Sequence, residues 1–128
     1  MTGKILVVDD EELVLKTVQR LLRKEGYEVI TARNGREAIQ HAKEGEFDLL
    51  VTDIRMPSMN GIEIIRQIRQ IRISAGKKPT PEICITGYAD NDLNHQAQEL
   101  GVADYLYKPF DLVEFLACVK KHLKEDGK

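Results

Sequence analysis

The most constraining feature of the sequence is a regular alternation of short apolar runs with longer segments whose apolar residues recur at helical spacing. Runs of apolar and β-branched residues, such as Leu49–Thr52, are typical of parallel strands that are buried on both faces. The predicted strands lie at residues 4–8, 27–31, 48–53, 82–86 and 103–107. Each is followed by a helical segment, which predicts a parallel sheet with right-handed crossovers and helices on both faces.

Five strands are too few for a closed eight-stranded barrel. We therefore predict an α/β fold with an open, doubly wound, five-stranded parallel sheet in the order 2-1-3-4-5, the flavodoxin-like (βα)5 arrangement. Isoleucines at positions 62, 65 and 68 could also form a strand. The glycine before them, their three-residue spacing and the need for a crossover favour a helix.

Two helix starts carry the pattern of a capping box, in which a polar residue is followed three positions later by a glutamate. The pairs are Asn34 with Glu37 and Asp111 with Glu114. The helix that begins at Asp111 is expected to bury Leu112, Phe115, Leu116, Val119 and Leu123.

The composition bounds the class of protein. The length of 128 residues suits one domain, expected over residues 1–128 with its core at about 4–123 and no output domain. A net charge of −2 argues against direct nucleic-acid binding, and no apolar run could span a membrane. Cys84 and Cys118 fit neither a disulfide framework nor a zinc site. Because the N-terminus has no signal-peptide pattern, we expect a reduced, soluble, cytoplasmic domain.

Polar residues gather where the predicted strands end. Asp9 and Asp10 follow the first strand, Asp53 ends the third, Thr86 ends the fourth and Lys108 follows the fifth. In the predicted strand order these ends are neighbours, at the edge where open α/β sheets place their ligands. A single acid there could be a turn former or a helix cap, but capping does not account for the whole set.

This set of residues predicts phosphoryl chemistry. Three carboxylates at close quarters resist ionising together unless a cation compensates them, and oxygen ligands suit Mg²⁺. An ionised aspartate can attack phosphorus to form an aspartyl phosphate. A metal ion and a lysine would neutralise the charge on the transferring phosphoryl oxygens.

Four segments together carry a resemblance to a known family. They are Val7–Glu11, Val51–Gly61, Ile85–Gly87 and Tyr105–Phe110. The chain from about Lys4 to Leu123 resembles the receiver domain of two-component response regulators. The ordered set of segments is highly specific, although no single segment is.

The resemblance implies a role for each matching residue. Asp53 would accept a phosphoryl group from a phosphohistidine, and Lys108 would contact that group. Mg²⁺ would be held by Asp10, Asp53 and the backbone carbonyl of Arg55, with Asp9 supporting the metal site. Thr86 would hydrogen-bond a phosphoryl oxygen after transfer, Tyr105 would be the aromatic switch, and the Lys108-Pro109 peptide would be cis.

The resemblance also implies partners. The phosphodonor would be a histidine kinase or a phosphotransfer protein, and residues from about 90 to 123 would form the signalling face. An output domain, an effector protein or a phosphorylation-dependent homodimer would receive the signal.

Arg55 and Tyr88 flank the expected acceptor site, two residues after Asp53 and after Thr86. We expect these large side chains to hinder the attacking water, so alanine at either position should speed loss of the phosphoryl group in a dephosphorylation assay. His41, His95 and His122 fall on predicted helices away from the acidic edge. We interpret them as surface residues without a donor or metal role.

Three other functions compete with this interpretation. A phosphatase or phosphotransferase resembling haloacid dehalogenases would have an Asp-x-Asp strand end, but the second position here is Arg55. A receiver-like module that no longer takes phosphate would not need the complete set of acceptor residues that this chain carries. A flavin-binding domain would need a phosphate-cradling loop, and residues 57–61 contain only one glycine.

Overall fold

The computed structural model describes residues 3–87 and 91–123. The strands are β1 (Lys4–Val8), β2 (Glu28–Ala32), β3 (Leu49–Asp53), β4 (Glu82–Thr86) and β5 (Asp104–Tyr107). The helices are α1 (Glu12–Lys24), α2 (Gly35–Glu44), α3 (Gly61–Ser74), α4 (Asn91–Leu100) and α5 (Leu112–His122). The isoleucine-rich segment is thus a helix, α3, as the crossover argument predicted.

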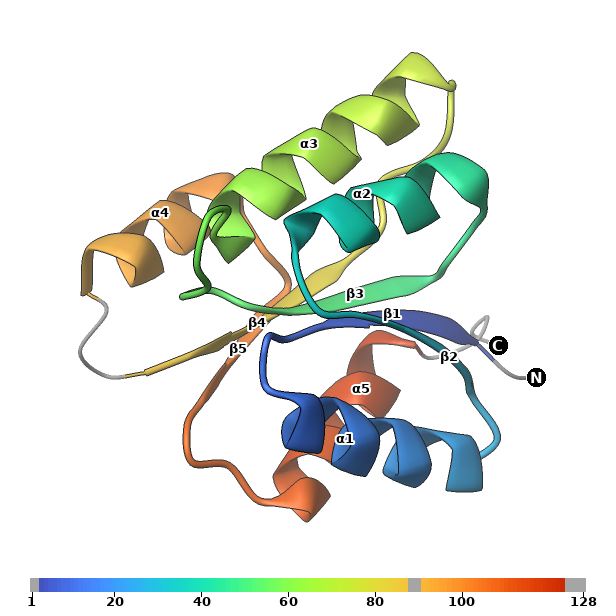
Figure 1. The fold of residues 1–128 in the computed structure, drawn as a ribbon, viewed down its shortest axis with the longest axis vertical. Helices are drawn as coiled ribbons and strands as arrows, with labels where there is room; N and C mark the ends of the chain where they lie inside the picture. The colour runs from blue at the N-terminus through green and yellow to red at the C-terminus, as the bar shows by residue number, and fades with distance from the viewer. Residues whose placement is uncertain (1–2, 88–90, 124–128) are drawn as a thin grey trace.

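All five strands are parallel and form one sheet in the order β2-β1-β3-β4-β5, which confirms the predicted topology. Helices α1 and α5 cover one face of the sheet, and α2, α3 and α4 cover the other (Figure 1). Each face holds its own apolar cluster. The central strands β3 and β4 are buried along their whole length, which explains why their sequences are apolar on both faces.

The ends of the helices differ from the sequence expectation in detail. The Asn34 side chain accepts from the N–H of Glu37, but the Glu37 carboxylate accepts from the N–H of Arg33 instead of closing the box. The complete capping box lies at the start of α3, between Asn60 and Glu63. At the start of α5, the Asp111 side chain accepts from the N–H of Glu114.

Leu112 was predicted to be buried, and this was wrong, because its exposed fraction is 40%. The aromatic rings of Phe110 and Phe115 stack with their centroids 5.6 Å apart, so Phe110 covers the first turn of α5 in its place. Phe115 and Val119 are fully buried as expected. Within the described ranges, the helices are all too short or too polar to cross a membrane.

Candidate functional site

Asp9, Asp53 and Lys108 lie together at the carboxyl edge of the sheet. The Lys108 ammonium donates to Asp53 Oδ2 over 3.0 Å and lies 3.8 Å from Asp9 Oδ2. Asp9 is fully buried and Asp53 is 5% exposed. Asp10 is exposed, yet one carboxylate oxygen from each of the three acids lies within 4.8 Å of the others. Strands β1, β3 and β5 therefore bring three acids and one base to one place.

Glu11 is a fourth acid at this edge that the sequence alone did not single out as a site residue. Its carboxylate accepts from Lys108 Nζ over 3.2 Å, and its backbone N–H donates to Asp9 Oδ1 over 2.9 Å. Its position directly after the Asp9-Asp10 pair was the available signal, but a carboxylate at the entry to a helix is common on any surface. Glu11 therefore orients both Asp9 and Lys108.

The charges at this edge are only partly balanced. Burial raises the pKa of Asp9 from 3.8 to about 6, against the opposing effect of the Glu11 N–H, and the nearby charge of Asp53 raises it further. Burial also raises the pKa of Asp53, and the hydrogen bond from Lys108 opposes this rise. Burial alone would lower the pKa of Lys108, but its hydrogen bond to Asp53 and the charges of Asp53 and Asp9 raise it above its ordinary value.

The donor set at this edge fits a hard divalent cation. Asp9 Oδ2 is fully buried and accepts no hydrogen bond from any residue in the described ranges. The ammonium of Lys108, at 3.8 Å, is too far away to donate to it. Mg²⁺ is typically held by one or two carboxylates and keeps several of its waters. A buried oxygen without a hydrogen bond, beside two further carboxylates, offers such an ion suitable ligands.

Thr86 lies at the end of β4, next to the acidic edge. The residue before it, Ile85, pairs with Asp53 in the sheet, so Thr86 extends one residue beyond this pair. Thr86 is fully buried, and its hydroxyl donates to Asn94 Oδ1 on α4. Asn94 is a site neighbour that the sequence did not reveal, because its contact depends on how α4 is rotated against the sheet.

Tyr105 is half-buried on β5 and packs against the apolar cluster on the face covered by α2, α3 and α4. Cys84 pairs with Tyr105, and Thr86 pairs with Tyr107. Because side chains alternate along a strand, Thr86 and Tyr105 lie on the same face as diagonal neighbours. The hydroxyl and the ring are therefore close enough in the sheet to share one rearrangement.

The other sequence predictions concern Arg55, Tyr88, the Lys108-Pro109 peptide and the histidines. Arg55 is exposed and follows the end of β3. Tyr88 lies outside the described residues. The Lys108-Pro109 peptide is cis, as the resemblance implied. Of the histidines, His95 is exposed, whereas His41 and His122 are half-buried.

Gly61 begins α3 in direct contact with the backbone of the candidate acceptor. A Cβ at position 61 would lie 2.9 Å from Ile54 Cα, and closer still to the carbonyl oxygen of Asp53. Because the obstacle is backbone, Gly61→Ala should shift the segment after β3 and lower the free energy of unfolding by about 1–3 kcal/mol. Gly45→Ala is the matched control, because a Cβ there meets no atom within 4 Å. Equal urea midpoints for the two variants would contradict this prediction.

Comparisons with known proteins agree with this geometry. The sequence model of a family described as "Response regulator receiver domain" matches residues 5–120. The chain is 40% identical over 121 residues to the transcriptional regulatory protein ResD of Bacillus subtilis, covering 94% of this chain and 48% of ResD. It is 37% identical over 126 residues to the transcriptional regulatory protein CrdR of Helicobacter pylori, covering 98% of this chain and 57% of CrdR. The chain thus spans about half the length of these relatives.

Solved structures show the same fold. The Vibrio cholerae chemotaxis protein CheY4 matches with a TM-score of 0.83 and 31% identity, over 96% of this chain and all of that protein. A response regulator receiver domain protein from Clostridium thermocellum matches with a TM-score of 0.82 and 31% identity, over 94% of this chain and 93% of that chain.

Proposed function

The chain belongs to the response regulator receiver family, and from this premise we propose that Asp53 accepts a phosphoryl group from a phosphohistidine on a kinase or phosphotransfer protein. The observation that carries this proposal is the 3.0 Å contact of Lys108 with Asp53, beside the unpartnered buried oxygen of Asp9. The Lys108 ammonium already contacts the proposed acceptor, and the acids beside it offer oxygen ligands for a metal ion.

In the proposed reaction, a carboxylate oxygen of Asp53 attacks the phosphorus of the donor. The bond from phosphorus to the donor's imidazole nitrogen breaks, and the imidazole keeps the electron pair. Lys108 stays within reach and offsets the negative charge of the transferring oxygens. Asp9, Asp10, Asp53 and the backbone carbonyl of Arg55 would hold Mg²⁺, which would neutralise further phosphoryl charge. Attack by water later releases inorganic phosphate, so the domain assists both its own phosphorylation and its dephosphorylation.

The switch that we propose uses the contact between Thr86 and Asn94. A phosphoryl group adds a charge of about −1.5 to −2 and three strong acceptor oxygens. The Thr86 hydroxyl would leave Asn94 for one of these oxygens and so release its hold on α4. Tyr105 would turn into the space that Thr86 leaves. The surface made by α4, β5 and α5 would then carry the signal to an output domain, an effector protein or a second copy of the chain.

Phosphoryl uptake tests this function. The protein is incubated with acetyl phosphate and Mg²⁺, and its intact mass is measured. We expect the mass of one phosphoryl group to be added in Mg²⁺ and none in excess EDTA. If acetyl phosphate is not used, the same measurement is repeated with a phosphorylated histidine kinase. No gain from either donor would favour the constitutive binding module instead.

An apolar surface beside the acceptor supports a docking role for the phosphodonor protein. A groove next to Lys108 is lined by residues of α1 and of the start of α5. Leu13, which lines the groove, is 76% exposed. A protein that delivers a phosphoryl group to Asp53 must approach this edge, so we propose that it packs on this groove.

Leu13→Asp should slow transfer from the phosphorylated kinase by about 10-fold or more, because a charge would replace a central apolar contact. Its rate with acetyl phosphate should stay unchanged, because that donor needs no docking surface. Ile73→Asp is the matched control, since Ile73 is 68% exposed but lies on α3. Equal slowing of both donors by Leu13→Asp would mean that the substitution damages the acceptor site itself.

Arg55 keeps its proposed role in setting the lifetime of the aspartyl phosphate. It is exposed next to the acceptor strand, where its side chain can screen the path of water. Arg55→Ala should therefore lose its phosphoryl group faster than the wild type, as followed by the decay of the phosphorylated mass in Mg²⁺ once the donor has been removed. An unchanged decay rate would remove Arg55 from the mechanism.

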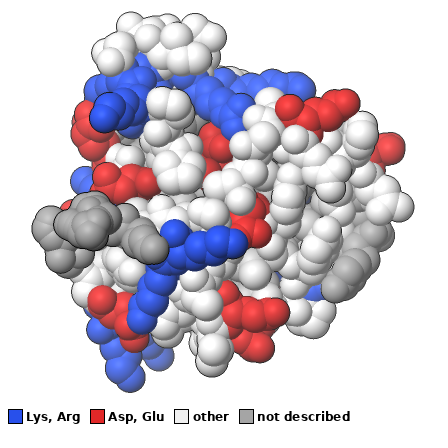
Figure 2. Space-filling model, turned by 180° about the vertical axis from the view of Figure 1, so that it is seen from behind, with Lys and Arg blue, Asp and Glu red and all other residues white. Residues whose placement is uncertain are grey.

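The charges on the face shown in Figure 2 support a protein partner rather than nucleic acid. Figure 2 shows Lys and Arg interspersed with Asp and Glu on the face that it presents, together with a broad uncharged area. Direct nucleic-acid binding generally uses a clustered basic surface. We propose that any contact of the regulator with DNA is made by an output domain.

A further inference from the structure

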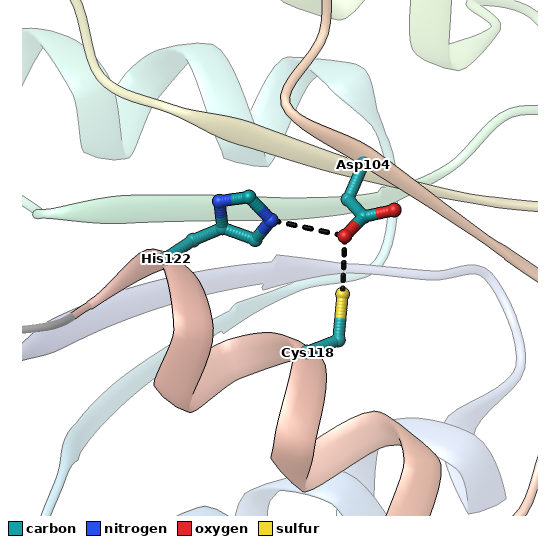
Figure 3. Close-up of side chains that lie close together, drawn as sticks. All are labelled: Asp104, Cys118 and His122. Atoms are coloured by element: carbon teal, nitrogen blue, oxygen red, sulfur yellow. Dashed lines mark hydrogen bonds and ion pairs between the residues drawn. The ribbon is translucent and has the colours of Figure 1, made fainter.

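A second cluster of metal-binding side chains lies away from the acidic edge. Asp104 begins β5, and Cys118 and His122 lie one turn apart on α5 (Figure 3). The three side chains point toward one another, and one ligand atom of each lies within 4.8 Å of the others. Asp104 lies at the start of its strand and Lys108 just beyond its end, so this cluster is separate from the phosphoryl site.

Two contacts converge on a single carboxylate oxygen. His122 Nε2 lies 3.0 Å from Asp104 Oδ2, and Cys118 Sγ lies 3.5 Å from the same oxygen. Around a tetrahedral Zn²⁺, bond lengths of 2.0–2.3 Å separate neighbouring ligand atoms by about 3.3–3.7 Å. The two distances to Asp104 Oδ2 are therefore already near the spacing that one ion would impose, and the sulfur and the imidazole nitrogen lie within 4.8 Å of each other.

The surroundings of the cluster also suit a metal ion. The other carboxylate oxygen, Asp104 Oδ1, accepts from the N–H of Tyr105 over 2.9 Å. This bond fixes the carboxylate and leaves Oδ2 toward the helix, as supporting hydrogen bonds do in metal sites. Cys118 is 8% exposed, whereas the side chains of His122 and Asp104 are 18% and 31% exposed. The sulfur is thus shielded while the two other ligands leave a path for entry.

We propose that Asp104, Cys118 and His122 bind one borderline divalent metal ion of the Zn²⁺ class. A thiolate, an imidazole and a carboxylate together select such an ion over Mg²⁺ or Ca²⁺, which prefer oxygen ligands. The fourth position is left for water or for a side chain of a partner. Binding releases the thiol proton to solvent, and the neutral imidazole binds through Nε2 with its proton on Nδ1.

In the competing interpretation, the three side chains only form hydrogen bonds that hold α5 against β5. Among the described residues, the Lys121 ammonium also lies near Asp104 Oδ2, at 3.9 Å. Its side chain is 71% exposed, so it can swing into solvent when a cation arrives. Holding α5 against β5 requires only one hydrogen-bond donor to the carboxylate. Here the thiol of Cys118 and the imidazole of His122 lie on the same face of α5, and both contact Asp104 Oδ2.

Cobalt provides the decisive measurement, because a thiolate bound to Co²⁺ gives a sulfur-to-metal charge-transfer band. The reduced wild-type protein is titrated with Co²⁺ in excess Mg²⁺, which occupies the oxygen-only site at the other edge. We expect the band and tetrahedral d–d bands to saturate at one ion per chain, and Zn²⁺ to displace them. A wild-type titration without the charge-transfer band would overturn the proposal, whatever the variants do.

Variants assign the ligands. Cys118→Ser should remove the charge-transfer band, and His122→Gln and Asp104→Asn should each weaken Zn²⁺ binding by at least about 100-fold. Cys84→Ala and His95→Gln are the matched controls and should bind as the wild type does. A band that survives in Cys118→Ser and disappears in Cys84→Ala would also refute the site. Phosphoryl uptake does not enter this readout, so the two proposals fail independently.

Discussion

Asp53→Asn is expected to abolish phosphoryl uptake from both acetyl phosphate and a phosphorylated kinase. The amide has no negative charge, so its oxygen cannot act as the nucleophile that forms an acyl phosphate. The substitution keeps the size and shape of the side chain at the end of β3. Intact mass after incubation with Mg²⁺ and either donor measures the result, with the wild type gaining one phosphoryl group and the variant none.

Asp48→Asn is the matched control for this experiment. Asp48 is an exposed acid just before β3, at the opposite end of the strand from Asp53. Its removal changes the net charge by the same amount, and uptake should proceed as in the wild type. A mass gain retained in Asp53→Asn, once misfolding is excluded by circular dichroism, would move the acceptor to another residue. Peptide mapping of the phosphorylated protein would then identify that residue.

The sequence predicted the sheet and the carboxyl edge because both depend on short-range signals. Strands buried on both faces, such as β3, appear in the sequence as unbroken apolar runs. A parallel sheet then places the carboxyl ends of these strands at the same edge. Asp9, Asp53 and Lys108 could be grouped by that argument alone. The protonation states of these residues could not be predicted, because the pKa of Asp9 depends on its complete burial next to Asp53. The residue types alone do not reveal that burial.

Contacts made by the faces of the helices could not be predicted from the sequence. Asn94 meets Thr86, and His122 meets Asp104, only through the rotation of α4 and α5 against the sheet. Sequence spacing places Cys118 and His122 on one side of a helix, but it does not say that a carboxylate of β5 faces them. The same uncertainty explains Leu112, which belongs to the apolar stripe of α5 by spacing and lies outside the core.

Asp9→Asn is expected to stabilise the protein in EDTA near neutral pH, by about 3 kcal/mol. The pKa of Asp9 is about 6 in the folded protein and 3.8 as its ordinary value, so the folded state binds the proton more tightly than the unfolded state. This gives a contribution to stability that is fully present below pH 3.8 and is lost as the pH rises through 6. The gap between the two pKa values corresponds to about 3 kcal/mol once both states are ionised. An uncharged amide avoids that loss, so the advantage of the variant should shrink as the pH is lowered toward about 4.

Mg²⁺ should remove most of this difference, which distinguishes a metal ligand from a buried carboxylate without a metal role. An ion that binds only the folded state at about 100 times its dissociation constant adds about 2.7 kcal/mol to the stability, nearly the whole penalty of ionising Asp9. The variant lacks one of the carboxylates that would hold the ion, so it should gain much less. Urea unfolding of both proteins in EDTA and in Mg²⁺ measures the four free energies. An equal increase in the free energy of unfolding for both proteins would exclude Asp9 from the metal site. An increase confined to the wild type would mean that the bound ion offsets the cost of burying the Asp9 charge.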